Sequence, residues 1–457
     1  MILFSLYLGI NFGLTEYSYA TKPPISHNYV GDEVWYVSAA RNILREVFHT
    51  YPYCPNTCNA TIQFKNGTDM TVFLVRYAKK FNLNSLYYYH KVKFAVYFQG
   101  PKSKIMELMK EKNKYNITIV QPGWRYPEQT GILKYLNLEH PPLGKYFIAS
   151  VMVHKDVPYM WRIPSIILGS LVVALVPIAV YLYTRSLALW IASLLMLYYD
   201  LPLRTMSMVA MLDIYSGAFS ALALAVLPFS LWAATLVLAL AISSKYTAAF
   251  YLIPIAYVFW RKKGHGPLKA LLVPSIVALV VFLVLSLPLM IALGPLNWLN
   301  KVLSGLAWFT VSRPSGPPPA NPWDWVEGKV PSPLYINPAL YVVTSAAVMK
   351  TAILAFFLLY PLKDQRKYWV PWMAAFFLVS SLLGFTALYL KGNKTLYTFY
   401  TVVFTPMADV AVAGIILLLT NFDDLGYAIS WWKRALKELS MWLWGDKKLK
   451  CELVEAK

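Results

Sequence analysis

Long uninterrupted apolar runs are the feature that most constrains the fold of this chain. Three of them, at residues 163–183, 268–293 and 402–419, approach or exceed the roughly 20 apolar residues that cross a bilayer as a helix. Because lipid offers no hydrogen-bonding partner to a peptide group, such runs fold as helices that satisfy their own backbone. The 58% share of hydrophobic residues extends this conclusion to the whole chain and excludes a soluble globular enzyme. We predict an all-α polytopic membrane protein.

Hydropathy along the chain predicts about ten transmembrane helices. The first occupies residues 1–20, because this segment lacks the basic start and the small-residue cleavage site of a signal peptide. The other nine are expected at 161–184, 186–200, 208–228, 229–243, 247–260, 268–294, 338–361, 369–390 and 397–420. The chain then divides into helices 2–7 within 161–294, helices 8–10 within 338–420, two large loops at 21–160 and 295–337, and a tail at 421–457.

Basic residues orient this predicted bundle. The net charge of +20 includes cations at 261–263, at 363–367 and in the tail, and all of these fall on one side if ten helices are counted. That side is predicted to be cytoplasmic, so the charge indicates topology and lipid headgroups rather than nucleic acid. The segment 425–443 mixes tryptophans with cations, which predicts an amphipathic helix lying at the interface. Four sequons lie on the predicted outer face, at Asn59, Asn66, Asn116 and Asn393.

The first outer loop is long enough to hold a small α/β insert at about 60–122. Alternating residues at 71–76 and 91–98 predict strands, helical spacing over 102–112 predicts a helix, and 116–120 predicts a further strand. Cys54 and Cys58 precede the insert, and an extracytoplasmic loop permits a disulfide between them, with two free thiols as the alternative. The second outer loop, 295–337, is rich in Pro and Trp and is expected at the headgroup level.

Two charged clusters in the first outer loop are the strongest candidates for chemistry. In the pair Asp32 and Glu33, one carboxylate could take a proton from an attacking hydroxyl while the other binds or orients. A simple helix cap is the alternative. The segment Glu139-His140-Pro141-Pro142-Leu143-Gly144-Lys145 combines a rigid diproline with two basic side chains, which we expect near a phosphate at the interface.

Charged residues inside or beside the apolar segments form the second group of candidates. Arg162, Arg204 and Lys245 are costly to place near lipid, which indicates partners, although snorkelling accounts for some such cations. Asp213 lies within an apolar stretch and is expected to face a polar cavity or to pair with Arg204 or Lys245.

Together these segments resemble the protein O-mannosyltransferases, the dolichyl-phosphate-mannose-dependent enzymes of glycosyltransferase family 39 in the GT-C membrane superfamily. Asp32-Glu33 resembles the family's Asp-Glu motif, and His140-Pro-Pro-Leu-Gly-Lys145 is similar almost letter for letter to its second loop motif. Further similar segments, in the same order, are Trp161-Arg-Ile-Pro-Ser165, Met211-Leu-Asp213, Ser244-Lys-Tyr246, and Tyr397-Thr-Phe-Tyr400 with Pro406. The resemblance covers about residues 25–415.

The resemblance implies inverting transfer of mannose from a polyprenyl (dolichyl) phosphate to Ser or Thr hydroxyls of a protein at the extracytoplasmic face. Asp32 would be the general base, with Glu33 also in the catalytic pair. Donor phosphate or sugar binding is assigned to His140, Lys145, Arg162, Arg204, Asp213 and Lys245. The lipid-linked sugar is a substrate, so no cofactor is predicted. No metal is predicted either, because the acids and the histidine lack a diagnostic ligand spacing.

Several alternatives stay open at this point. About 105 residues separate Asp32 from His140, and the 295–337 loop is too short for the β-trefoil domain of eukaryotic members. Another polyprenyl-phosphate sugar or a lipid or glycan acceptor is therefore an alternative, and a transporter or flippase is a remote one. The expected location is the cell membrane of an archaeon or bacterium, or the endoplasmic reticulum membrane of a eukaryote. The expected partners are the donor lipid, an acceptor protein or peptide and membrane lipids, with no nucleic acid and with oligomerisation left open.

Overall fold

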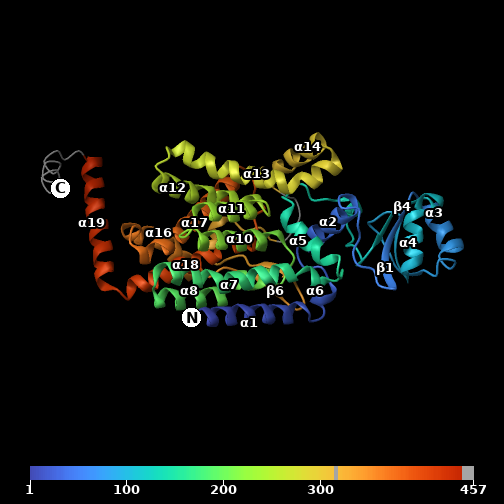
Figure 1. The fold of residues 1–457 in the computed structure, drawn as a ribbon, viewed down its shortest axis with the longest axis horizontal. Coiled ribbons are helices and arrows are strands. Elements are labelled where there is room, and N and C mark those ends of the chain that lie inside the picture. Colours follow the sequence, from blue (N-terminus) through green and yellow to red (C-terminus); the bar gives the residue numbers. More distant parts are fainter. Residues whose placement is uncertain (313–317, 445–457) are drawn as a thin grey trace.

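A computed structural model describes residues 1–312 and 318–444 as a long helical body with a small sheet domain at one end (Figure 1). The mostly helical architecture with a sheet insert in the first loop confirms the predicted fold class. Residues 313–317 of the Pro-rich loop and the end of the basic tail, 445–457, lie outside the described residues.

Each of the ten predicted segments contains or overlaps an apolar helix of the body. These helices are α1 (Ile2–Ala20), α7 (Ile163–Thr184), α8 (Leu187–Tyr199), α10 (Leu212–Val226), α11 (Leu231–Ile242), α12 (Leu252–Lys263), α13 (Pro267–Leu293), α16 (Ala346–Leu358), α17 (Arg366–Leu390) and α18 (Thr405–Leu419). Within the described residues, three helices are long and apolar enough to cross a membrane, or up to five if each bent pair is one span. The count of ten crossings therefore stays a prediction.

Breaks in the helices explain why so many of them are short. The chain bends by 52° between α8 and α9 (Leu201–Ser207), at Asp200 and just before Pro202. The outer ends of two predicted spans are 3₁₀ turns instead, η5 (Tyr246–Tyr251) before α12 and η8 (Thr398–Val403) before α18. Irregular backbone at membrane depth is tolerated where protein or a cavity covers it. These broken helix ends therefore indicate the part of the body in which buried polar groups are expected.

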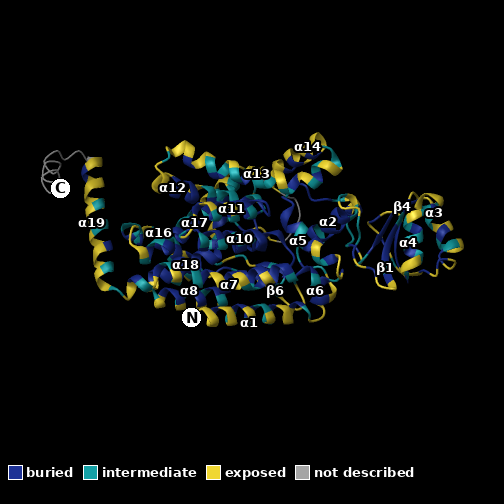
Figure 2. Ribbon diagram, viewed as in Figure 1, coloured by how far each residue is buried: buried dark blue, intermediate teal, exposed yellow. Residues whose placement is uncertain are grey.

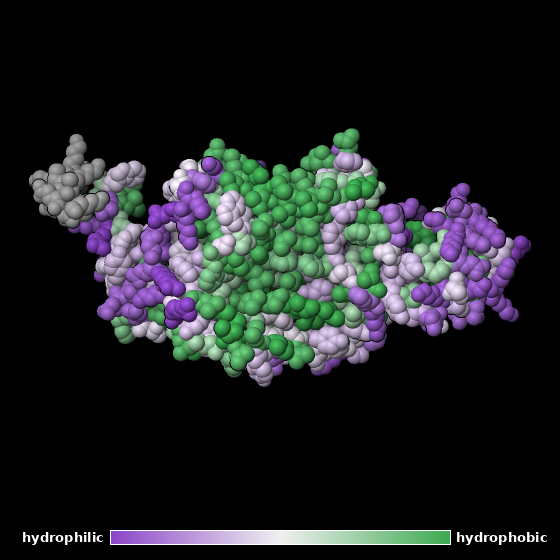
Figure 3. Space-filling view, in the orientation of Figure 1, coloured by the Kyte–Doolittle hydropathy of each residue, from purple (hydrophilic) through white to green (hydrophobic). Residues whose placement is uncertain are grey.

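The surface along the sides of the body is apolar, as is its interior. Figure 3 shows a continuous hydrophobic surface over the middle of the body, with hydrophilic residues at its two ends. On α13, Ile276, Leu279 and Val284 are each more than half exposed, and Figure 2 shows exposed faces along α1 and α13. An apolar surface of this extent is stable in lipid rather than in water.

The insert is a four-stranded antiparallel sheet with strand order β2-β3-β1-β4. Its strands are β1 (Thr57–Phe64), β2 (Asn84–Tyr88), β3 (Ala95–Pro101) and β4 (Ile117–Pro122), accompanied by α3 (Gly67–Val72), the π-helical turn η2 (Phe73–Tyr77), α4 (Lys102–Lys110) and η3 (Lys112–Tyr115). The predicted helix at 102–112 and strand at 116–120 are confirmed. The predicted strand at 71–76 is wrong, because Asn66 caps a helix there by accepting a hydrogen bond from the Asp69 amide. Cys54 and Cys58 are disulfide-bonded in this structure.

The insert packs on the loop that leads to the candidate site. Tyr89, Tyr97 and Ile119 on one face of the sheet pack with Tyr126 and Ile132 from the following segment. That segment continues through η4 (Ile132–Lys134) into α5 (Leu143–Met152) and α6 (Pro158–Trp161), which lie beside α2 (Glu33–Glu46) at the same end of the body (Figure 1).

The 295–337 loop is more ordered than a plain connection. It contains α14 (Pro295–Leu306), η6 (Ala307–Thr310), α15 (Pro322–Val326) and β5 (Ser332–Tyr335), which pairs with β6 (Leu340–Val342). The predicted span at 338–361 therefore begins only at α16, because its first apolar residues form a strand. At the opposite end, η7 (Tyr360–Leu362) leads toward α17, and α19 (Phe422–Trp444) leaves α18 at an angle of 103°, where the amphipathic helix was expected.

One close contact fixes the broken segment η8 against the body. A Cβ on Gly217 of α10 would lie 2.4 Å from the carbonyl oxygen of Val402. We expect Gly217→Leu to lower the free energy of unfolding by about 1–3 kcal/mol, because backbone atoms must move to admit the side chain. The measurement is the melting temperature in detergent. Gly266→Leu is the control, since a Cβ at that position meets no described atom within 4 Å; equal melting temperatures would contradict the contact.

Candidate active site

Asp32 occupies the N-cap position of α2 at the end of the body that carries the insert, which is the predicted outer end. The preceding Gly31 has φ +53°, a conformation that suits glycine, and its amide donates to the carbonyl of Leu334 in β5 at 3.1 Å. The loop 295–337 thus helps to fix the turn. Asp32 is half-buried, and within the part of the chain that the structure describes its side chain makes no capping hydrogen bond to α2. The simple helix-cap interpretation is therefore not supported.

Glu33 is fully buried, in contrast to its neighbour. Its two carboxylate oxygens accept bonds from Nε and Nη2 of Arg162 at 2.7 and 2.8 Å, and from the amides of Val30 and Ala210 at 2.8 Å each. Four donors around one buried carboxylate stabilise its charge and fix its position. Glu33 therefore orients the turn that carries Asp32, which is the role predicted for the second acid of the pair; its part in catalysis stays a prediction.

Arg162 is equally buried and faces inward. Besides Glu33, its guanidinium donates to the carbonyls of Ile25 and Asn28 at 2.9 Å each and of Ala20 at 3.4 Å. These acceptors occupy N–H groups of the guanidinium, which has five in all. In this structure the side chain ties α1 and η1 (Ile25–His27) to the Asp32 turn, and its predicted role as a phosphate ligand stays a prediction.

Lys145 also points into the protein. Its ammonium donates to the carbonyls of Asn137 and His140, the latter at 2.8 Å, and is fully buried. Burial lowers the pKa of Lys145 to about 7, and the nearby charge of Glu139 opposes this shift. Lys145 thus holds the loop that carries Glu139 and His140, and its assignment as a direct phosphate ligand stays a prediction.

Arg204 lies elsewhere in the body. It forms an ion pair with Glu16 of α1 at 2.7 Å, and its guanidinium lies over the rings of Phe12 and Tyr198. These contacts join α9 to α1 and α8. Among the described residues Arg204 forms no ion pair with another candidate, and its predicted phosphate role stays a prediction.

Asp213 and Lys245 form a buried ion pair, Nζ to Oδ1 at 2.5 Å, which confirms one of the two pairings expected from the sequence. Asp213 lies in the first turn of α10, and Lys245 immediately precedes η5. The Lys245 ammonium also lies 4.0 Å from the centre of the Tyr400 ring. The pair therefore places one fixed cation at the broken outer end of the helices.

A small cavity of about 40 Å³ joins several of these groups. Its lining comes from segments far apart in the sequence: Glu139 and His140 before α5, Lys245 and Thr247 at η5, Gly305 of α14, Phe385 and Leu388 of α17, and Asn393, Leu396 and Tyr400 before α18. Of the predicted site residues, His140 and Lys245 line it directly. Sequence reasoning did not assign Tyr400 or Asn393, although the aromatic motif at 397–400 was a signal for the first.

Tyr135 contacts the carboxylate of Glu139, which lines this cavity. Its hydroxyl donates to Glu139 Oε1, which also accepts from the Asn137 side chain at 2.9 Å. Burial raises the pKa of Tyr135 above its ordinary value, and the charges of Glu139 and, more weakly, Asp32 add to the rise. On the same helix as Asp32, the ring of Tyr36 lies 5.8 Å from that of His140.

Among the described residues no cluster of three or more His, Cys, Asp or Glu side chains is arranged to hold a metal ion.

Comparisons with known proteins give one structural similarity. No protein-family model matches the sequence, and no curated protein matches it. The structure is similar to the crystal structure of ArnT from Cupriavidus metallidurans in the apo state, with a TM-score of 0.44 and 15% sequence identity. The similarity covers 61% of this chain and 49% of that one, so the chain spans about half the length of that structure. The activity of this protein has to be inferred from its own residues.

Proposed function

We propose that this protein is a membrane glycosyltransferase that transfers mannose from a polyprenyl phosphate to Ser or Thr hydroxyls of a protein. The observation that carries the proposal is that the two neighbouring acids, Asp32 and Glu33, lie in different environments. Glu33 is buried under four donors, whereas Asp32 is half-buried at the same end of the body as a cavity with His140 and Lys245. A partly exposed carboxylate on a rigid turn, at the same end of the body as a lysine and a histidine that can donate to a phosphate, suits a base acting next to an anionic leaving group.

The proposed reaction is a single displacement. The acceptor oxygen forms a bond to the anomeric carbon while the bond from that carbon to the phosphate oxygen breaks, so the configuration inverts. Asp32 takes the hydroxyl proton, and the electron pair of the broken bond leaves with the polyprenyl phosphate. His140 and Lys245 stabilise the charge that develops on this phosphate, and Asp213 holds the Lys245 ammonium in place.

The lipid-facing surface and the resemblance of the motifs support a lipid-borne donor. A hydrophobic surface covers the sides of the body up to the end that carries the site (Figure 3), so a polyprenyl chain can remain in the bilayer while its phosphate reaches the cavity. The sugar arrives already activated, which removes any need for a nucleotide-binding motif. The cavity of about 40 Å³ has room for little more than water. Substrate binding therefore requires the surrounding loops to move apart.

Transfer by the purified full-length protein tests the proposal. We expect transfer of radiolabelled mannose from polyprenyl-phosphate mannose to a Ser/Thr-rich peptide, detected on the isolated peptide. Parallel reactions supply polyprenyl-phosphate glucose, or replace the peptide with a lipid acceptor. If the protein turns over only one of these alternative substrates, the assignment as a glycosyltransferase holds, but the proposed sugar or the proposed acceptor is wrong. If the folded protein uses no lipid-linked sugar, the proposal fails.

A further inference from the structure

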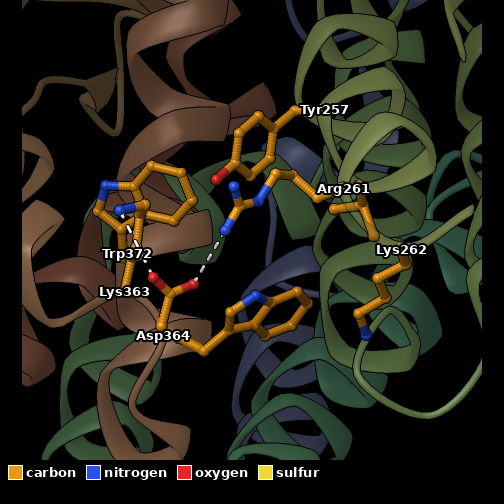
Figure 4. Close-up of a pocket in the computed structure, with 8 residues that line it drawn as sticks. Tyr257, Arg261, Lys262, Lys363, Asp364 and Trp372 are labelled. Carbon is orange, nitrogen blue, oxygen red and sulfur yellow. Dashed lines mark ion pairs between the residues drawn. The ribbon is translucent and has the colours of Figure 1, made fainter. Parts of the chain in front are cut away.

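A second cavity lies at the end of the body opposite the candidate active site. It encloses about 200 Å³ between the last turns of α12 and the start of α17. Figure 4 shows Arg261 and Lys262 of α12 on one side, and Lys363, Asp364 and Trp372 on the other. In Figure 1, α12 and α16 lie toward α19, at the far end from the insert. None of the steps proposed for sugar transfer uses these residues.

The lining of this cavity has a surplus of positive charge. Arg261, Lys262 and Lys363 contribute three cations against the single carboxylate of Asp364. That carboxylate lies 3.5 Å from Arg261 and 3.7 Å from Lys363, but its side chain is 73% exposed, so water screens both pairs. Two positive charges are therefore left for an anionic ligand.

Aromatic rings hold two of these cations in defined positions. The Lys363 side chain is only 17% exposed, and its ammonium lies 4.0 Å from the centre of the Tyr360 ring. The Lys262 ammonium lies 4.9 Å from the Trp369 ring. Cation–π contacts of this kind restrict long side chains that would otherwise be mobile. The cavity is thus a built pocket rather than a set of independent surface charges.

The surroundings of the cavity place it at the level of lipid headgroups. Ile253 and Trp260 on α12 are about half exposed, and together they give this helix an apolar outer face. Trp at the edge of an apolar belt is typical of the membrane–water interface, and basic pockets between helices at that level bind lipid headgroups. The planar guanidinium of Arg261 suits two parallel hydrogen bonds to a phosphate.

We propose that this cavity binds the phosphate group of an anionic membrane lipid, on the membrane face opposite the candidate active site. The three cations neutralise the phosphate, the indoles pack against the glycerol region, and the acyl chains lie along the apolar face of α12. This site is independent of the proposed glycosyl transfer, so either can fail without the other.

Lipid binding to the full-length protein in detergent tests this site, with phosphatidylglycerol as the probe and native mass spectrometry as the readout. We expect Arg261→Gln/Lys363→Gln to weaken binding at least tenfold. Arg76→Gln/Lys79→Gln is the matched control, because it removes the same two kinds of charge from exposed positions on the sheet insert, at the far end of the body from this cavity, and should bind like wild type. If the double variant in the pocket does not fold, Lys262→Gln alone should still weaken binding several-fold.

Two results would overturn the proposal. The first is a pocket variant that binds phosphatidylglycerol as the control variant does. The second is inorganic phosphate that displaces the lipid from wild type at a comparable concentration, because the ligand would then be the free anion rather than a headgroup.

Discussion

Asp32→Asn is expected to lower the rate of sugar transfer about 10²- to 10⁴-fold, the usual contribution of a general base. The amide has nearly the size of the carboxylate but cannot accept the acceptor's proton at neutral pH. The turn itself should persist, because Gly31 and Glu33 fix it through bonds that do not involve the Asp32 side chain. We therefore expect kcat to fall while the melting temperature and the KM for the donor change little.

Glu46→Gln is the matched control for this experiment. Glu46 is the last residue of the same helix, α2, and its carboxylate pairs with Arg45 at the surface. Losing a carboxylate there should leave transfer unchanged. An Asp32→Asn enzyme that turns over at the wild-type rate would exclude Asp32 as the base and leave Glu139, which lines the cavity, as the next carboxylate to test.

The pairing of Asp213 shows what the sequence could predict. An acid in an apolar segment is costly enough to predict a polar cavity or a basic partner around it, and Arg204 and Lys245 are the partners that the sequence suggests. The structure selects Lys245, because the break before η5 turns its side chain toward the start of α10. Arg204 pairs with Glu16 instead. The need for a partner follows from composition, whereas the choice between two partners depends on how broken helices are arranged.

The inward orientation of Arg162 and Lys145 could not be predicted from the sequence. Arg162 and Lys145 lie in motifs that suggested phosphate binding, yet both donate to backbone carbonyls of neighbouring turns. A carbonyl acceptor has no signature in the side-chain sequence, so a cation that holds a loop cannot be told from a cation that holds a ligand. Both nevertheless support the site: Arg162 holds the Asp32 turn and Lys145 holds the loop of His140.

Element boundaries show a similar limit. Hydropathy located the ends of α13 within one residue and those of α17 within three, because each is a long continuous helix. It missed the 3₁₀ turns η5 and η8 and the strand β6, whose residues are equally apolar. Hydropathy measures burial or lipid contact and does not distinguish a helix from a covered turn. These three segments are also where the body departs from a simple bundle near the site.

The buried pair of Arg162 and Glu33 is expected to be the most sensitive stability determinant at the outer end of the body. Arg162→Met should lower the free energy of unfolding by about 3–5 kcal/mol, because it leaves the Glu33 charge buried without its main partner. Lys350→Met is the control. It breaks a pair with Glu327 of similar length, 2.9 Å, but with both side chains exposed by more than 40%. That loss should be much smaller, because water screens an exposed pair.

Thermal unfolding in one detergent, together with the KM for the donor, separates the two roles considered for Arg162. A large fall in melting temperature with Arg162→Met, and a small one with Lys350→Met, is the result expected of an inward-facing support. If Arg162→Met instead melts like the control while its donor KM rises tenfold or more, the guanidinium contacts the phosphate after all. Opening of the cavity would then have to release it from the carbonyls of η1, and Arg162 would belong with His140 and Lys245 as a ligand.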